Sequence, residues 1–483
     1  MIGISKQFWF YLVCFVFVAI NLAAITFDFP WAGLIPFLLI FCYLILFKLD
    51  TLILLLAFLV PLSVSFENVG FGLGISLPDE PLIIGIMFLS VFKFIITSEY
   101  DFRIFKHPIT IAIAINFLWL IITTCTSNFP IISFKFLLSR FWYLIVFYFL
   151  GIMLFRYYKN IVKYLWLYMI SLFGVVVYTL IKHGAVNFSL LTSYGIAQPF
   201  FSDHGIYAAT ISLFIPLLSC YVLFYRRMGL NYIGLFIAAV FLIIFLTGVY
   251  YSFTRAAWIG VIVSATFLVP VILRIRFNTL ILILFFTVSF AYVFQDQILY
   301  TLSKNQQKSA NGGFSTHFQS ISNIKTDPSN TERINRWMSA IAMFDEKPIL
   351  GFGPGTYSFC YAPFQQFKYK TVISTNFGDG GNSHSEYLNP LAESGLFGLL
   401  SFLAIIYFVL NTGFRLYFTA QRFKVRIMSL AICLGLITYF VHGFMNNYSE
   451  SDKIGAVLWA FVGMITALDI YHNKNKSTRS EQQ

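Results

Sequence analysis

Long apolar segments recur along almost the whole chain, and they constrain its fold more than any other feature. Many of them reach the length of about 17 residues or more that a helix needs to cross a bilayer. Only 11% of the residues are charged and 59% are hydrophobic, whereas a soluble protein would carry roughly twice that charged fraction. The 58 Phe and 28 Tyr suit lipid-facing surfaces with aromatic belts. The sequence therefore predicts an all-α, polytopic membrane protein.

The apolar segments divide into about 12–14 transmembrane helices. Fourteen candidate spans lie near 8–26, 31–47, 50–65, 80–97, 107–125, 134–155, 161–182, 204–225, 231–249, 255–273, 277–295, 385–411, 426–446 and 454–470. The first follows a basic start but lacks a small-residue cleavage site, so we interpret it as a retained helix instead of a signal peptide. The two spans that flank Lys48–Asp50 could instead be one broken or re-entrant element.

Basic residues occur in short clusters between the spans, which predicts the orientation of the chain. With the N-terminus inside, 19 of the 32 Lys and Arg residues fall on the inner side and five on short outer connections. This bias follows the positive-inside rule. It predicts that both termini are cytoplasmic and that residues 296–383 lie outside. Because the net charge of +12 is spread over these clusters, it does not indicate nucleic-acid binding.

Four regions follow from this topology: a helical bundle at 1–295, a large outer loop at 296–383, three spans at 384–472 and a cytoplasmic tail at 473–483. Within the loop, Ser329 and Glu332 form a predicted capping box for a helix near 330–346. The Gly-rich sequence Gly351–Gly355 follows a helix instead of a strand, so we interpret it as a flexible turn and not as a phosphate loop.

The strongest local signal is Asn382-Ser-His-Ser-Glu-Tyr387, at the end of the loop. Ser383 and Glu386 form a second predicted capping box, which would place His384 in the first turn of a helix. The helix dipole would then keep the imidazole neutral and able to accept a proton, as a general base requires. The alternative interpretation is an interfacial histidine that caps the helix or contacts a lipid headgroup.

Several charged residues are further candidates. Arg255 stands at the outer end of a span, where it must find an aqueous cavity or an anionic partner such as a lipid pyrophosphate; snorkelling to headgroups is the alternative. Arg140 and Lys135 invite the same argument. Most arginines on a loop helix, such as Arg333 and Arg336, lie on solvated surface. Glu393, nine residues into a span, would be functional or interfacial.

No His, Cys, Asp and Glu residues have the spacing of a metal site, which favours a mechanism without metal or cofactor. Cys360 is the one cysteine of the loop, so an intraloop disulfide is not expected.

Taken together, these motifs resemble the O-antigen ligase and polymerase superfamily. The sequence HSEYLNPLAESGLFGL, with His384-Ser385, nine residues, Gly395 and Gly398, resembles the signature at the end of the family's large periplasmic loop. The stretch TERINRWMSAIAMFDEKPILGFGPGTY resembles the helix and turn of the same loop, with Arg333 as the matching arginine and Arg336 as an additional one. SFTRAAW resembles the family's Ser/Thr-Arg motif and singles out Arg255.

The resemblance implies a GT-C-like, metal-independent, inverting glycosyltransferase of the bacterial inner membrane. Its donor would be a glycan on undecaprenyl pyrophosphate, and its acceptor lipid A–core or another glycan. His384, Arg255 and Arg333 would be catalytic, and Arg255, Arg333, Arg336 and Arg140 would hold the pyrophosphate. Supporting positions would be Ser385, Glu386, Tyr387, Gly395 and Gly398.

The form of the signature favours a ligase, with a repeat-unit polymerase as the alternative and a protein-glycosylating branch as a third. From a different class, a transporter of lipid-linked sugars would predict repeated halves and ionisable or broken helices near mid-membrane. No repeat is evident in the sequence. A structural membrane scaffold is the remaining alternative.

Overall fold

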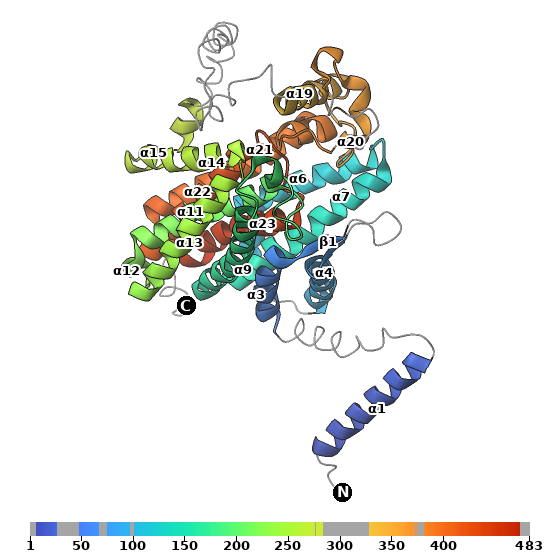
Figure 1. Cartoon of the computed structure of the whole chain (residues 1–483), viewed down its shortest axis with the longest axis vertical. Helices are drawn as coiled ribbons and strands as arrows, with labels where there is room; N and C mark the ends of the chain where they lie inside the picture. Colours follow the sequence, from blue (N-terminus) through green and yellow to red (C-terminus); the bar gives the residue numbers. More distant parts are fainter. Residues whose placement is uncertain are drawn as a thin grey trace.

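The computed structural model describes residues 6–26, 48–66, 75–96, 101–275, 277–283, 328–371, 374 and 381–473. Over these residues the chain is helical apart from one two-stranded hairpin, in which Val64 pairs with Leu77 and Phe66 with Ile75. The predicted all-α class is therefore confirmed (Figure 1).

The elements follow one another along the chain in this order. They are α1 (Lys6–Thr26), α3 (Leu49–Leu59), the 3₁₀ turn Val60–Leu62, β1 (Val64–Phe66), β2 (Ile75–Leu77), α4 (Asp79–Ile96), α5 (Phe102–Phe105), α6 (Pro108–Cys125), α7 (Pro130–Tyr143), the π-helical segment Leu144–Phe149, α8 (Leu150–Phe155), α9 (Tyr158–Gly184), α10 (Leu190–Ser193), α11 (His204–Leu223), α12 (Tyr225–Met228), α13 (Tyr232–Tyr251), α14 (Arg255–Thr266), α15 (Leu268–Ile272), α19 (Pro328–Glu346), α20 (Tyr357–Cys360), the 3₁₀ turns Ala362–Phe364 and Phe367–Tyr369, α21 (Leu388–Thr419), α22 (Phe423–His442), α23 (Asp452–Ala467) and the π-helical segment Leu468–His472.

Nine helices in the described part of the chain are long and apolar enough to span a membrane. They correspond to nine of the predicted spans: 107–125, 134–155, 161–182, 204–225, 231–249, 255–273, 385–411, 426–446 and 454–470. Helices α1 and α4 coincide with the predicted elements 8–26 and 80–97. The predicted span 31–47 and most of 277–295 lie outside the described residues.

The predicted span at 50–65 differs from the structure. Helix α3 ends at Leu59, the 3₁₀ turn that follows contains Pro61, and the chain then turns into strand β1. Pro61 cannot donate a backbone hydrogen bond, which explains the early end of the helix. The apolar helical stretch Leu49–Leu62 is consequently shorter than a full span.

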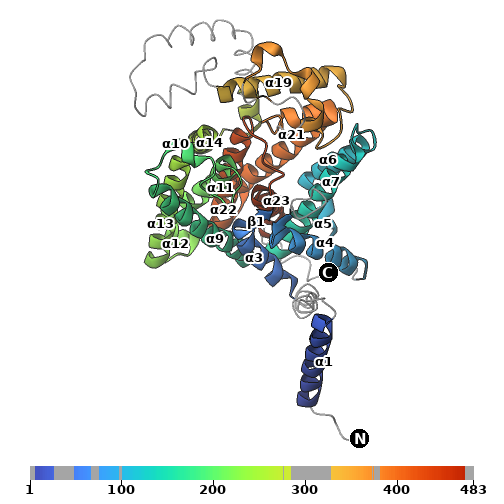
Figure 2. The same cartoon turned by 45° about the vertical axis from the view of Figure 1, so that its right-hand side comes forward.

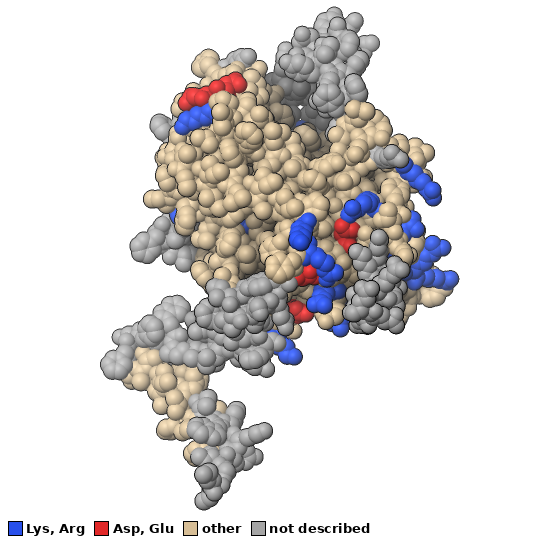
Figure 3. Space-filling model, turned by 180° about the vertical axis from the view of Figure 1, so that it is seen from behind, with Lys and Arg blue, Asp and Glu red and all other residues tan. Residues whose placement is uncertain are grey.

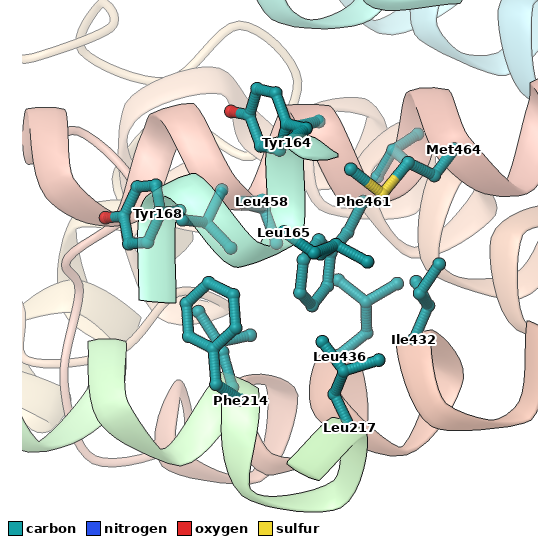
Figure 4. Packing of buried hydrophobic residues seen from close by; sticks show 14 of the residues in the cluster. Tyr164, Leu165, Tyr168, Phe214, Leu217, Ile432, Leu436, Leu458, Phe461 and Met464 are labelled. Atoms are coloured by element: carbon teal, nitrogen blue, oxygen red, sulfur yellow. The ribbon is translucent and has the colours of Figure 1, made fainter. Parts of the chain in front are cut away.

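The core of the bundle lies where α9, α11, α22 and α23 meet (Figure 4). Phe214 and Leu217 of α11 point toward Ile432 and Leu436 of α22, and Phe461 of α23 lies among them. Of the 18 most apolar consecutive residues in each spanning helix, 83% are buried in the helices that contain α22 and α23. The corresponding share is only 28% in the helices that contain α13 and α14. Helices α22 and α23 are therefore central, and α13 and α14 are peripheral.

The loop helix α19 lies at one end of the bundle, over the start of α21 (Figure 2). On the face drawn in Figure 3, the middle of the molecule carries little charge, and most Lys and Arg side chains lie toward the end away from the loop. Both observations fit a bundle whose middle faces lipid.

Candidate functional site

The described part of the loop has its own small core next to α21. Ala340 and Met343 of α19, Tyr357 and Tyr361 around α20, and Ala392 of α21 are buried together. The predicted end of the loop helix near Glu346 is confirmed. Because Ala392 belongs to α21, this core joins the loop directly to a helix of the bundle.

The glycine-rich segment after α19 docks onto a break in α21. At Gly395 the backbone of α21 leaves the helical region, with φ +68° and ψ −167°. The amides of Phe352 and Gly353 donate to the carbonyls of Ala392 (3.2 Å) and Glu393 (2.8 Å). The amide of Leu396 donates to the carbonyl of Pro348 at 2.9 Å. We call this contact of residues 348–355 with residues 392–396 the glycine latch.

The carboxylate of Glu393 completes the glycine latch. It is 3% exposed and accepts hydrogen bonds from the amides of Gly355 and Tyr357, each at 2.9 Å. This geometry answers the question that the sequence left open for Glu393, because the side chain ties the loop to α21. It also corrects the interpretation of Gly351–Gly355 as a flexible turn, since the turn is fixed by these hydrogen bonds.

The spacing of the signature glycines follows from the latch. A Cβ at Gly395 would lie 2.1 Å from the carbonyl oxygen of Ile349, and one at Gly351 would lie 2.3 Å from the carbonyl carbon of Glu393. Both residues have positive φ, which side chains disfavour. A Cβ at Gly398 would lie 2.4 Å from Cβ of Ser394, in the turn that restarts the helix. Gly395 therefore serves to dock the loop, and Gly398 leaves room for Ser394 where the helix restarts.

His384 lies before α21 and not in its first turn, so the prediction from the second capping box is wrong. The helix begins at Leu388, and His384 has a left-handed φ of +52°. Its amide donates to Oδ1 of Asn382 (2.9 Å), and its carbonyl accepts from the indole of Trp337 on α19 (3.3 Å). The backbone of His384 is consequently fixed by Asn382 and by the loop helix.

The imidazole of His384 is kept neutral for a different reason from the one the sequence suggested. Burial, together with the positive charges of Arg336 and Arg333, lowers the pKa of His384 to about 3. Its Nδ1 is buried and has no hydrogen-bond partner among the described residues. A buried ring nitrogen of this kind is costly unless a ligand satisfies it.

The three residues after His384 hold the segment in place. The hydroxyl of Ser385 accepts from the amides of Tyr387 and Leu388, and so takes the capping role predicted for Ser383. Glu386 does not cap the helix, because its carboxylate accepts from the hydroxyls of Tyr439 and Ser449 and from two backbone amides. The hydroxyl of Tyr387 donates to the carbonyl of Phe440 at 2.8 Å.

Arg336 is a buried residue, so the alternative that it lies on a solvated surface is wrong. Its guanidinium pairs with Glu332 at 2.9 Å, and both side chains are only 5–6% exposed. It also donates to the carbonyl of Asn382 at 3.0 Å, which fixes the start of the His384 segment. Glu332 therefore pairs with Arg336 instead of closing a capping box at the start of α19, which begins at Pro328.

Arg333 lies one turn before Trp337 and faces a group of histidines. Its charge acts on His384, His204, His442 and Tyr448. We call the three histidines and Arg333 the histidine cluster. Among the described residues, Nδ1 of His384 and both ring nitrogens of His442 are buried without a hydrogen-bond partner. Nδ1 of His204 also lacks a hydrogen bond there, but it lies 3.7 Å from the carboxylate of Asp203. Unpaired ring nitrogens around one guanidinium indicate a site for a polar ligand.

Arg255 begins a helix of the membrane bundle whose first turn lies beside His204. It is the first residue of α14, and the hydroxyl of the preceding Thr254 donates to the carbonyl of His204 (3.4 Å). Helices α11 and α14 thus begin side by side. Their N-termini add partial positive charge at the same place as the arginine, and such an arrangement favours an anion.

Sequence reasoning missed Asp203, His204, His442 and Tyr448. Asp203 caps α11 by accepting from the amide of Gly205, and Tyr448 donates to Asp203 at 3.4 Å. The signal available in the sequence was an ionisable or polar residue at the loop-side end of each apolar span. It could not show that these span ends converge.

Arg140 lies in a different place from Arg255 and Arg333. It projects from α7 into two cavities that it shares with Glu450, and one of these, of about 300 Å³, is also lined by Lys135. Its guanidinium stacks over Phe136 (5.5 Å) and Trp459 (5.7 Å). The four predicted pyrophosphate-binding arginines are thus not equivalent: Arg336 is structurally paired, and Arg140 lines a cavity with a glutamate.

Among the described residues, no group of three or more His, Cys, Asp and Glu side chains is arranged to hold a metal ion.

In a comparison with known protein families, residues 239–403 match a family model described as O-antigen ligase. The matched region begins in α13 and includes Arg255, Arg333, His384 and the glycine latch. No curated protein matches the chain. The match over these residues, together with the signature residues in one helical membrane fold, supports a relationship to the O-antigen ligase and polymerase superfamily.

Proposed function

We propose that the protein transfers a glycan from undecaprenyl pyrophosphate to an acceptor hydroxyl at the periplasmic face of the bacterial inner membrane. The observation that supports this most is the histidine cluster, where the charge of Arg333 acts on His384 and on His204, and His204 lies beside the start of α14. In this proposal both termini are cytoplasmic and residues 296–383 are periplasmic, as the distribution of basic residues favours.

In the proposed reaction, the acceptor oxygen attacks the anomeric carbon of the donor sugar while the bond from that carbon to the pyrophosphate oxygen breaks. The configuration inverts, as expected for a single displacement. His384 takes the hydroxyl proton, and the pyrophosphate leaves as an anion. Arg255 and Arg333 stabilise the charge that grows on it, and the beginnings of α11 and α14 add to this field.

Binding of the donor would also prepare the base. In the free protein, burial and two arginine charges depress the pKa of His384 to about 3, which makes it a weak base. A pyrophosphate beside Arg333 would offset part of that positive charge. The pKa of His384 would then rise toward its usual value, so the imidazole would gain basicity when the donor is in place.

The proposal is tested by His384→Ala and Arg255→Ala in proteoliposomes that contain the lipid-linked donor and the acceptor. Loss of the base should lower transfer by about 10²- to 10⁴-fold. Lys159→Ala, at an exposed position of α9, is the matched control and should keep full activity. Full transfer by both correctly inserted variants would show the assignment to be wrong.

Within the superfamily we favour a ligase that joins the glycan to lipid A–core, because the His-Ser form with paired glycines fits that signature. Lipopolysaccharide banding in a deletion strain separates the two activities. Loss of the whole ladder with an intact core identifies a ligase, whereas retention of a single repeat identifies a polymerase.

A further inference from the structure

The cavities beside Arg140 are a second polar site that the proposed mechanism does not use. The larger one, of about 300 Å³, lies between α7 and the segment at 449–450, and Gly355 of the latch also lines it. This volume is at the lower end of small-ligand sites. Glu386, Asn389 and Trp459 line the adjoining smaller cavity, together with Arg140 and Glu450.

Arg140 and Glu450 face these cavities without pairing with each other. In the described part of the chain, no hydrogen bond or ion pair of either side chain is found, although the charge of Arg140 acts on Glu450. The guanidinium is held only by the rings of Phe136 and Trp459. Its planar array of donors is thus oriented before any ligand binds, which makes hydrogen bonds to a ligand less costly.

The backbone after Arg140 supports a role in binding. Helix α7 passes at Leu144 into a π-helical segment that extends to Phe149. Such segments are rare and occur frequently at functional sites, because the wider turn shifts the side chains that precede and follow it. Here the segment begins four residues after Arg140 and directly follows Tyr143, which also lines the larger cavity.

The lining favours a sugar over a phosphate. Glu450 and Glu386 would repel an anion, whereas a sugar hydroxyl can accept from Arg140 and donate to Glu450 at the same time. Asn389 adds a side-chain amide, and the aromatic rings of Phe136 and Trp459 offer apolar faces. A few oriented polar groups among aromatic walls are typical of small-molecule sites.

We propose that the cavities of Arg140 and Glu450 bind a saccharide unit of the acceptor. This inference rests on the proposed function. Glu386 and Asn389 line the cavity, whereas His384, two residues before Glu386, is influenced by Arg333. If the pyrophosphate leaves toward Arg255 and Arg333, an inverting displacement requires the acceptor on the opposite side of the reacting carbon. The Arg140 side of the His384 segment provides that position.

Photocrosslinking of the full-length protein in its native membrane tests the site without a purified ligand. A benzoylphenylalanine probe replaces Ile132, which lines the larger cavity, and a matched probe replaces Ile131, whose side chain is 76% exposed on the same helix. After irradiation and denaturing purification, bound saccharide is oxidised with periodate and labelled with a hydrazide dye. Labelling is expected at position 132 and not at 131.

Arg140→Gln and Glu450→Gln should each lower the labelling at position 132 by about tenfold, because charge-assisted hydrogen bonds to the sugar are lost. Arg140→Lys should restore part of it. Size-exclusion elution shows that each variant is folded. The proposal would be overturned by equal labelling at 131 and 132, or by no label at 132. It would also be overturned by unchanged labelling in both variants, or by a polyprenyl phosphate on the adduct.

The two proposals fail separately. The crosslink is repeated in His384→Ala, where the saccharide should still bind. Full transfer by His384→Ala would overturn the mechanism and leave the saccharide site standing, whereas loss of the crosslink in the otherwise native protein would overturn the site and leave the mechanism standing.

Discussion

The glycine latch and the histidine cluster both include residues near the start of α21. Buried polar groups are hydrogen-bonded in the first and unpaired in the second. In the latch, the carboxylate of Glu393 accepts from two amides, and the carbonyls of Ala392 and Glu393 accept from loop amides. In the cluster, ring nitrogens of His384 and His442 are buried without a hydrogen-bond partner among the described residues. Paired groups stabilise the fold, whereas unpaired groups reduce stability and are available to a substrate.

Arg336 and Arg333, three residues apart on α19, test this contrast most strongly. Arg336→Gln should cost about 3–5 kcal/mol of stability, because it leaves Glu332 buried without its partner. Arg333→Gln should retain the stability and lower transfer to a residual rate. Thermal unfolding followed by size-exclusion chromatography, together with transfer in proteoliposomes, measures both. The contrast breaks down if the two variants lose stability equally.

Gly395→Ala should disrupt the latch alone. The new Cβ would meet the carbonyl of Ile349 in a backbone region that only glycine adopts readily, at a cost of about 3 kcal/mol. Gly174→Ala in α9 is the matched control, since nothing lies within 4 Å of its Cβ position. A normal melting temperature for Gly395→Ala would mean that the latch contributes little.

The smallest expected effect concerns pH. In the free protein the pKa of His384 is about 3, below its usual value, so the imidazole stays neutral as pH falls through 6.5. The acid limb of kcat/KM reports the pKa of His384 in the free enzyme and should therefore lie well below pH 6. The acid limb of kcat reports the enzyme with bound donor, in which the pKa of His384 is higher, and should lie at higher pH. Arg333→Gln removes a positive charge and should shift the kcat/KM limb upward. An acid limb of kcat/KM near pH 6.5 in the unmodified protein would contradict this assignment.

Much of the fold could be predicted from the sequence, because a membrane span is a local property of some 20 consecutive residues. The end of the loop helix at Glu346 could be predicted for the same reason. The sequence around each predicted capping box could not show whether the box forms. Glu332 and Glu386 have the right spacing for a box, but each finds stronger partners elsewhere, Arg336 for the first and the segment around Tyr448 for the second.

The candidate site was predictable only in part, for a similar reason. Motif resemblance found His384, Arg255 and Arg333, but the separation of Arg140 from them depends on how distant helices pack. The glycines of the signature were also seen in the sequence. The role of Gly395 became visible only once the carbonyl of Ile349 was placed against it.

The break at Gly395 has a consequence for biosynthesis. The carbonyls of Ala392, Glu393 and Ser394 receive hydrogen bonds from the loop and from Trp119 of α6, and the amide of Leu396 donates to Pro348 of the loop. Before these partners arrive, α21 carries unpaired backbone groups and a buried-type carboxylate, which are costly to expose to lipid. The loop is synthesised first. The glycine turn of the loop and α6 must therefore form their hydrogen bonds to α21 while that helix inserts into the bilayer. The candidate site thus assembles at the same time as α21 integrates into the membrane.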